Sequence, residues 1–268
     1  MLVVIRGAGD LASGIALRLY RAGVRIVMLD VEVPTAVRRS VAFSEAIRLG
    51  EAQVEGIKAV RAKDVTDALR IVGEKNIAVL VDPEGACISE LKPDVLVDAI
   101  LAKRNIGTTK DMAPVVIGVG PGFKAGTDSK SDCHAVIETK RGHYLGKVIY
   151  DGMPIPNTGV PGNIGGFTKE RVLWSPAEGI FEPVAKIGDV VKRGDIVAMV
   201  SGVPVKATID GVLRGLLQEG VPVTKGMKSG DIDPRCKVGH CFSASDKARA
   251  IGGGVLEALC HFTERLDG

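Results

Sequence analysis

Short apolar runs alternate with amphipathic segments over the first 120 residues. The apolar runs, which predict strands, occupy residues 2–5, 25–30, 77–81, 94–98 and 115–119. The amphipathic segments, which predict helices, occupy residues 11–22, 40–50 and 64–73, and each is closed by a glycine. Strands that alternate with helices are typical of a parallel, doubly wound sheet. We therefore expect an α/β fold with a Rossmann-like domain.

A different pattern begins after residue 120. Residues 134–140 and 145–150 flank Gly142, which can adopt the positive φ of a tight turn, and so predict a β-hairpin. Residues 153–166 are rich in proline and glycine and predict a loop or linker.

The expected domain organisation has three parts. From Ser243 the sequence predicts a serine-capped helix that runs to about Leu266. The parts are a Rossmann-like nucleotide- or cofactor-binding domain at 1–120, a β-rich domain at 121–240, and a C-terminal helix at 241–268 that packs back on the first domain.

Residues 175–235, inside the β-rich part, resemble a biotinyl/lipoyl-like barrel. The repeated turn of that fold is matched by Gly188-Asp189 and Gly194-Asp195. Lipoyl and biotinyl carriers hold their modified lysine at the tip of a hairpin. Here residues 208–211 occupy the tip, and Lys206 lies two residues early. We therefore expect the barrel without the carrier function.

Charge and composition exclude several classes of protein. The chain has 268 residues, of which 35 are basic and 32 acidic, for a net charge of +3. These charges are spread out without a basic–aromatic patch, so we expect no nucleic-acid partner. No uncharged apolar stretch reaches the ~18 residues of a membrane span, and no signal peptide precedes the first strand, so we expect a cytoplasmic protein with no membrane contact. The five cysteines form no CxxC pair, which favours reduced thiols.

The segment Gly7-Ala-Gly9-Asp10-Leu-Ala12 follows the first expected strand and opens the first expected helix. In a dinucleotide-binding turn, the first glycine makes the tight turn, the second admits the pyrophosphate, and the small third residue lets the helix pack closely. Asp30 ends the second strand, where an acid that binds ribose is expected. Gly7, Gly9, Asp10, Ala12 and Asp30 are therefore candidate cofactor-binding residues.

Asp10 is an unusual residue for such a turn. Two unit charges ~4 Å apart repel by about 4 kcal/mol at an effective dielectric of about 20, so Asp10 would weaken the binding of an ordinary dinucleotide. Alternatively, Asp10 lies in the first helical turn, where it complements the helix dipole, and Arg6 neutralises it. We expect NAD(P) to be a poorer ligand than another phosphorylated cofactor. Arg38 and Arg39 either bind a 2′-phosphate or lie on a solvated helix face.

A second glycine-rich turn, at residues 118–123, overlaps the end of the strand at 115–119. Its Gly120 and Gly122 either form a nest of backbone amides that binds an oxyanion or make a structural crossover turn. If the two turns face each other across the carboxyl edge of the sheet, the ligand lies between them.

Cysteine, histidine and glycine clusters supply the remaining candidates. Three histidines each adjoin a cysteine, but neighbouring residues on a strand point to opposite faces, so we expect no metal site. Cys241 is the candidate catalytic thiol, and the alternative is a small core residue. Gly252–Gly254 lie inside the terminal helix, where each costs roughly 1 kcal/mol relative to alanine. We expect them to allow close helix packing or backbone approach to a ligand.

Eight segments resemble one known family closely. They are IRGAGDLASGIALRLYRAG, RRSVAFSEAI, VLVDAILAKRN, IGVGPGF, HAVIETKRGHYLGKVIY, PNTGVPG, DIDPR and SDKARAIGGGVLEAL. The chain is similar over nearly its whole length to the YqeB-like accessory proteins of the selenium-dependent molybdenum hydroxylase system. Its first domain is also similar to the Rossmann domain of xanthine dehydrogenase accessory factors, which act on the molybdenum cofactor before insertion.

The resemblance implies a maturation role, in which the chain binds the molybdenum cofactor as a molybdopterin dinucleotide or assists selenium insertion. The implied partner is the molybdenum hydroxylase apo-enzyme, and we expect the chain itself to form a homo-oligomer. Only the turn positions Gly7, Gly9 and Ala12 carry over, and Asp10 would then accept hydrogen bonds from the pterin. Whether the chain is an enzyme stays open, and the alternatives are an NAD(P)-dependent oxidoreductase and an enzyme that transfers selenium through the Cys241 thiolate.

Overall fold

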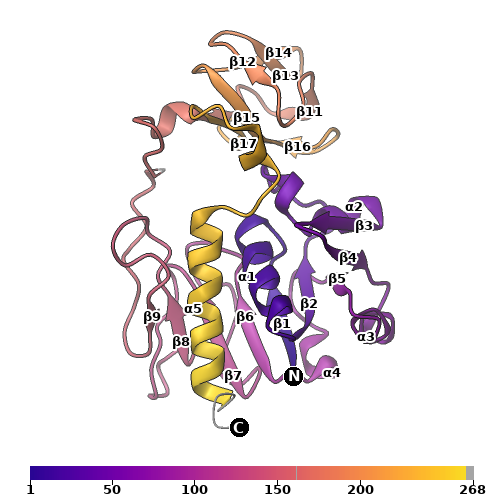
Figure 1. Cartoon of the computed structure of the whole chain (residues 1–268), viewed down its shortest axis with the longest axis vertical. Coiled ribbons are helices and arrows are strands. Elements are labelled where there is room, and N and C mark those ends of the chain that lie inside the picture. The colour runs from indigo at the N-terminus through magenta and orange to yellow at the C-terminus, as the bar shows by residue number, and fades with distance from the viewer. Residues whose placement is uncertain (161, 264–268) are drawn as a thin grey trace. The chain divides into compact units, whose positions relative to one another are not determined.

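The computed structural model of the chain describes residues 1–160 and 162–263 and contains two units (Figure 1). The first unit comprises Met1–Pro34, Phe43–Thr158 and the residues from Ala244 on. The second comprises Thr35–Ala42 and Gly159–Ser243. Residues 121–158 thus belong to the first unit, whereas the sequence analysis placed them in the β-rich part. The expected helix end near Leu266 lies outside the described residues.

A nine-stranded sheet forms the centre of the first unit. Its strand order is β3-β4-β5-β2-β1-β6-β7-β8-β9. The strands are β1 (Leu2–Arg6), β2 (Arg25–Asp30), β3 (Glu51–Val54), β4 (Ile57–Arg61), β5 (Ile77–Val81), β6 (Val95–Asp98), β7 (Val115–Val119), β8 (Ala135–Ile137) and β9 (Val148–Ile149). Every neighbouring pair from β4 across to β8 is parallel, whereas the edge pairs β3–β4 and β8–β9 are antiparallel.

The sheet is therefore mixed, and the expectation of a parallel, Rossmann-like sheet is wrong. The physical reason lies at the edges of the sheet. Glu55 and Gly56, with φ of 48° and 81°, form the two-residue turn between β3 and β4. So short a turn joins only antiparallel strands, because a parallel pair needs a long crossover. The helix expected at 40–50 shrinks to α2 (Glu45–Leu49), because Arg39–Val41 form a separate 3₁₀ helix in a segment, Thr35–Ala42, that belongs to the second unit.

The remaining helices cover the two faces of this sheet, and two of them pack closely on each other. They are α1 (Asp10–Arg21), α3 (Val65–Gly73), α4 (Ile88–Leu91) and α5 (Asp246–Thr263). Helices α1 and α5 lie side by side (Figure 1). A Cβ atom at Gly252 would lie 2.9 Å from the carbonyl oxygen of Gly14, so the two backbones approach closely. Packing between helices therefore explains the glycine at 252.

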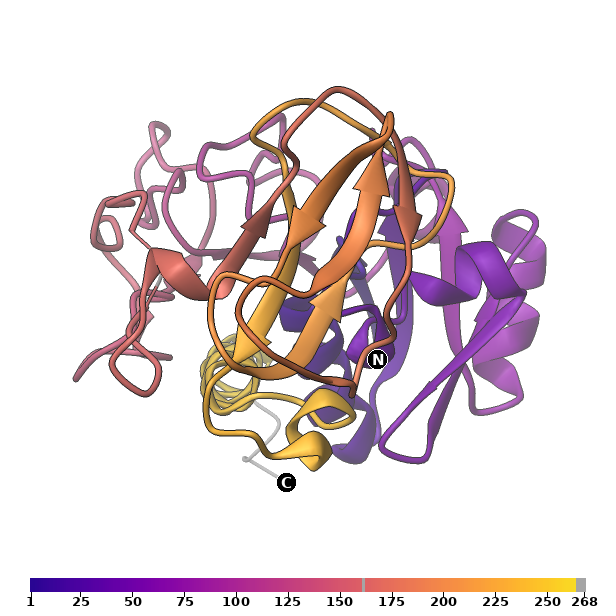
Figure 2. The same cartoon turned by 90° about the horizontal axis from the view of Figure 1, so that it is seen from above.

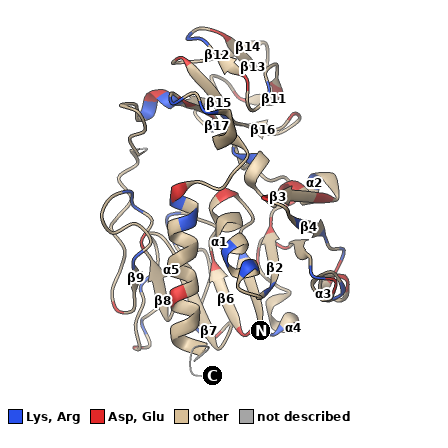
Figure 3. Cartoon of the chain, viewed as in Figure 1, with Lys and Arg blue, Asp and Glu red and all other residues tan. Residues whose placement is uncertain are grey.

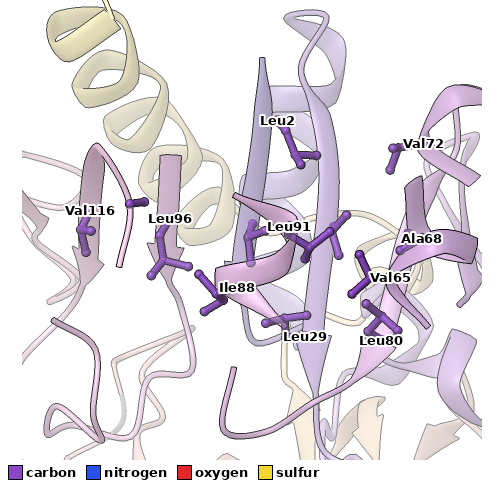
Figure 4. Close-up of a cluster of buried hydrophobic side chains, with 14 of the residues drawn as sticks. Leu2, Leu29, Val65, Ala68, Val72, Leu80, Ile88, Leu91, Leu96 and Val116 are labelled. Atoms are coloured by element: carbon purple, nitrogen blue, oxygen red, sulfur yellow. The ribbon is translucent and has the colours of Figure 1, made fainter. Parts of the chain in front are cut away.

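An apolar core fills the space between the sheet and helices α3 and α4 (Figure 4). Its side chains include Leu2, Leu29, Leu80 and Leu96 from the strands and Ala68, Val72, Ile88 and Leu91 from the helices. Successive side chains of a strand point to opposite faces. Leu2 and Val4 of β1 belong to this core. Arg6, which ends β1, is therefore on the same face.

The second unit consists of two four-stranded antiparallel sheets (Figure 2). One has the order β10-β17-β15-β12 and the other β14-β13-β11-β16. The strands are β10 (Val172–Trp174), β11 (Gly179–Pro183), β12 (Val190–Val191), β13 (Ile196–Val200), β14 (Val203–Lys206), β15 (Gly211–Leu216), β16 (Pro222–Val223) and β17 (Lys228–Asp233). Phe181 and Val200 from one sheet and Leu213 and Ile232 from the other share one buried core.

These sheets correct the expected biotinyl/lipoyl-like barrel, which is wrong. Within the described residues no strand pairing joins one sheet to the other, so the strands do not close into a barrel. The core also receives a segment from far away in the sequence. Val37 is buried in it, and the carbonyl oxygen of Val37 accepts a hydrogen bond of 2.8 Å from the Leu216 backbone N–H. The gap between the two sheets is thus filled partly by residues that the sequence analysis assigned to the first domain.

Basic and acidic residues are interspersed over the elements of both units (Figure 3). Among the described residues, no helix is both long enough and apolar enough to cross a membrane.

Candidate functional site

The carboxyl ends of β1, β2, β6 and β7 meet at one edge of the first unit's sheet. These four strands are neighbours and run parallel, so the segments that follow them gather there. The chain's strand order switches at β1, which pairs with β2 on one side and with β6 on the other. In open α/β sheets ligands bind at the carboxyl edge beside such a switch. This edge is the candidate site.

The turn at residues 7–9, the glycine turn, connects β1 to α1. Gly7 has φ of 97°, and its N–H donates to the carbonyl oxygen of Leu29 over 2.6 Å. Gly9 is the N-cap residue of α1, and no side chain of the described residues caps it. A Cβ atom at Gly9 would meet no other described part of the chain within 4 Å. The N-terminus of α1 is therefore open to an anion.

Asp10 and Ala12 lie just inside α1. Asp10 is the first residue of the helix, where a carboxylate interacts favourably with the helix dipole. Ala12 is 1% exposed and packs inside the unit. Both residues thus have roles in the helix itself.

Asp30 holds the glycine turn in place. Its Oδ2 accepts a hydrogen bond of 2.7 Å from the Ala8 N–H, and its Oδ1 accepts one of 2.8 Å from the Val31 N–H. Burial raises the pKa of Asp30, although both hydrogen bonds lower it. The residue expected to bind ribose therefore already fixes the backbone of the turn.

The second glycine-rich turn is explained by close packing. Gly120 has φ of 85°, and a Cβ atom there would lie 2.9 Å from the Thr139 hydroxyl oxygen. Gly122 has φ of 112°, and its Cβ position overlaps the backbone of Arg104. Of the two alternatives left open by the sequence, these contacts favour the structural turn.

The segment at residues 99–104, the bridging segment, contacts both glycine-containing turns. A Cβ atom at Gly7 would lie 2.8 Å from the carbonyl oxygen of Ala99, and Gly122 packs on Arg104. Leu101 and Lys103 have φ of 61° and 65°, which is uncommon for residues other than glycine. The two turns therefore do not face each other directly, because the bridging segment lies against both.

Two cations that the sequence analysis did not single out lie on the bridging segment. Lys103 and Arg104 are exposed, and neither forms a hydrogen bond or ion pair with the described residues. Backbone strain of this kind clusters at ligand sites. The signal in the sequence was a pair of basic residues shortly after a strand that ends in Asp98.

Arg6 does not neutralise Asp10 but belongs to a buried polar cluster. Its Nη1 donates to the Thr108 hydroxyl over 2.6 Å, and its Nη2 donates to the Pro83 carbonyl over 3.1 Å. The Thr108 hydroxyl in turn donates to Asp98 Oδ2 over 2.6 Å. The distance from Arg6 Nη1 to Asp98 Oδ2 is 3.6 Å. These partners follow β5 and β6, so the sequence near the glycine turn did not reveal them.

Arg38 and Arg39 lie in the second unit, whereas the candidate site belongs to the first. The Arg38 Nη2 donates to the backbone carbonyls of His240 and Ser243, and Arg39 Nε donates to that of Leu216. Neither of the two alternatives weighed for these arginines fits this arrangement, because both side chains tie the segment at 35–42 to the β-rich unit.

Cys241, the candidate thiol, is completely buried in the second unit. Its Sγ lies 3.8 Å from the Leu213 carbonyl oxygen, to which it donates a weak hydrogen bond. Burial raises the pKa of the Cys241 thiol, although Arg38 and Arg214 nearby lower it. A buried thiol with a raised pKa is a poor nucleophile at neutral pH.

The DIDPR motif forms an ion network inside the second unit. Asp231 accepts hydrogen bonds from Arg171 and Arg214. Asp233 accepts two hydrogen bonds, of 2.9 and 2.7 Å, from the Arg235 guanidinium. Despite its burial, Asp233 has its pKa lowered to about 2 by Arg235 and Arg214. The motif therefore has a structural role in this unit.

Comparison with known proteins places the chain next to a bacterial protein of no assigned function. No family model matches the chain. The chain is 55% identical over 258 residues to "Uncharacterized protein YqeB" of Escherichia coli K12, a match that covers 96% of this chain and 47% of the relative. It thus spans about half the length of the curated relative it matches.

Solved structures give only distant matches. An aspartoacylase family protein from Mesorhizobium loti is 14% identical, with 86% of this chain and 84% of that chain covered and a TM-score of 0.28. A succinylglutamate desuccinylase from a Silicibacter species is 12% identical, with the same coverage and a TM-score of 0.25. The 55% identity over nearly the whole chain supports the YqeB family that the sequence motifs indicated.

Proposed function

We propose that the carboxyl edge of the first unit's sheet binds a phosphate-bearing cofactor, and that the chain acts in the maturation of a selenium-dependent molybdenum hydroxylase. The observation that carries the binding proposal is the open N-terminus of α1 beside the bridging segment with its exposed Lys103 and Arg104. Helix N-termini and basic side chains are the two groups that proteins use most to bind phosphate.

The described residues fit one part of the dinucleotide form of the molybdenum cofactor, its pyrophosphate group. Gly9 leaves room for the phosphates, and the exposed Lys103 and Arg104 would supply positive charge at the same sheet edge. Asp30 keeps the turn in a fixed conformation, so the site is preorganised. When bound, the cofactor would supply the molybdenum chemistry of the partner hydroxylase. The chain's own residues would bind and orient the cofactor for transfer.

Native mass spectrometry of the protein from its own host tests the binding proposal. We expect the wild-type protein to release a molybdopterin dinucleotide on denaturation. The double variant Lys103→Ala/Arg104→Ala should lose at least tenfold in occupancy. A control is Lys192→Ala/Arg193→Ala, which removes another exposed neighbouring pair of basic residues, in the second unit. Equal occupancy in both double variants would overturn the assignment of the edge, and release of NAD(P) would favour an oxidoreductase instead.

The maturation proposal needs a separate readout. Apo-hydroxylase should gain activity when incubated with the cofactor-loaded wild-type chain, and gain much less with the Lys103→Ala/Arg104→Ala variant. Activation that is independent of the chain would contradict the maturation role while leaving the binding site intact.

A further inference from the structure

A buried arginine ends the central strand of the first unit. Arg6 is 2% exposed and lies on the sheet face that α3 and α4 cover. Burial of a charged group is unfavourable unless hydrogen bonds and an opposite charge compensate it. The contacts of Arg6 therefore indicate what this position is for.

The guanidinium of Arg6 is only partly used. It carries five N–H donors. One donates to Thr108 and one to Pro83, while Nε has no hydrogen-bond partner among the described residues. An unsatisfied buried donor costs about 1–3 kcal/mol. Such donors are rare in folded proteins, so the unsatisfied Nε–H of Arg6 marks a position where an acceptor on a ligand would be stabilised.

The carboxylate nearest to Arg6 has its own partners. Asp98 accepts hydrogen bonds from the Thr108 hydroxyl, over 2.6 Å, and from the Ile100 N–H, over 3.1 Å. Its distance of 3.6 Å from Arg6 Nη1 is too long for a hydrogen bond. Asp98 therefore stays hydrogen-bonded if Arg6 contacts a second anion.

Two surface turns separate Arg6 from solvent. Pro83 and Glu84 are exposed, and a Cβ atom at Gly85 would lie 3.5 Å from Arg6 Nε. Thr108 is buried, but its neighbours Gly107 and Thr109 are exposed. Both covering segments are loops rather than helices or strands, and an anion reaches the guanidinium only when one of them is displaced.

We infer that Arg6 forms a buried oxyanion subsite beneath the turns at 82–85 and 105–109. The ligand group is a phosphate or a carboxylate, because the planar guanidinium edge matches the two oxygens of either group. The inference rests on the proposed function, since it adds a second anion contact at the same sheet edge. The ligand then carries two anionic groups, one at the N-terminus of α1 and one at Arg6.

Calorimetric titration with pyrophosphate and, separately, with malonate tests the subsite and distinguishes the two kinds of oxyanion. Arg6→Lys keeps the positive charge near Asp98 but removes the Nε–H donor and the planar edge. We expect this variant to bind the preferred anion at least tenfold more weakly than the wild type. The control Arg25→Lys changes an exposed arginine at the start of β2 and should bind within twofold of the wild type. Unchanged binding by a folded Arg6→Lys variant would overturn the subsite.

Hydrogen exchange on the wild-type protein provides a test that needs no variant. The anion should slow amide exchange in residues 82–88 and 105–110, and unchanged exchange in both segments would also overturn the inference. The two proposals fail separately. If Lys103→Ala/Arg104→Ala loses the anion and Arg6→Lys keeps it, the subsite is wrong and the edge assignment stands. If Arg6→Lys alone loses the anion, the subsite stands and the assignment of the phosphates to the bridging segment is wrong.

Discussion

Adjacent glycines in α5 offer an internal comparison of helix propensity against packing. A Cβ atom at Gly253 would meet no other described part of the chain within 4 Å. A Cβ atom at Gly254 would overlap the carbonyl oxygen of Gly146 and approach the Ile137 side chain to 3.1 Å. Gly253→Ala and Gly254→Ala add the same methyl group to the same helix at neighbouring positions.

The expected magnitudes follow from this geometry. Both variants gain about 1 kcal/mol from the higher helix propensity of alanine. Only Gly254→Ala also forces a backbone carbonyl away, and overpacking of a well-packed core costs about 1–3 kcal/mol. Because the obstacle is backbone rather than a flexible side chain, we expect a value near the upper end. Gly253→Ala should therefore be more stable than the wild type, and Gly254→Ala less stable.

Urea unfolding followed by far-UV circular dichroism measures the free energy of unfolding of each variant. The helix signal reports on the first unit, because α1, α3 and α5 all belong to it. A gap of about 3 kcal/mol corresponds to roughly 6 °C or more in Tm for a unit of this size. If Gly254→Ala is as stable as Gly253→Ala, then α5 does not pack on Gly146 as described, and the explanation of the glycines by close packing is refuted.

Two further predictions concern the second unit. The pKa of Asp233 is about 2, below its ordinary 3.8, so its ionised form stabilises the unit by about 2 kcal/mol above pH 4, and this contribution is lost as the pH falls through about 2. Acid unfolding followed by Trp174 fluorescence should show this loss of stability. The Asp233→Asn variant should be less stable than the wild type near neutral pH, and its stability should change less between pH 4 and 2. If the variant has the same dependence of stability on pH as the wild type, the ion network is contradicted. Iodoacetamide at pH 7.5 should alkylate exposed Cys236 first, because Cys241 is buried and burial raises the pKa of Cys133 to about 12. Rapid labelling of Cys241 in the native protein would restore the thiol-transfer alternative.

The central elements of the first unit could be predicted from local sequence patterns. The apolar runs at 77–81 and 115–119 are β5 and β7, and the amphipathic segment at 11–22 is α1 to within one residue at each end. Such patterns identify elements because the burial of one face repeats with the period of the element itself. The glycine turn was likewise recognisable, since its spacing reflects local backbone geometry.

The edge strands of the sheet and the architecture of the second unit could not be predicted in this way. The hairpin of β3 and β4 lies in residues 51–61, where the hydrophobic pattern predicted no element. The segment at 35–42 is separated from the end of β2 by four residues but packs in the β-rich core through Val37. Spacing alone does not show which distant residues a short segment will contact.

The sequence by itself determined where most central strands and helices of the first unit lie, and the position of the glycine turn. Only the tertiary structure decided that the sheet is mixed, that Arg6 contacts Thr108 and Pro83 rather than Asp10, and that Lys103 and Arg104 lie on the segment between the two turns. The physical reason is that periodic burial is a local property of the chain. The partner of a polar side chain, in contrast, is chosen by whichever distant segments the sheet order brings to the same edge.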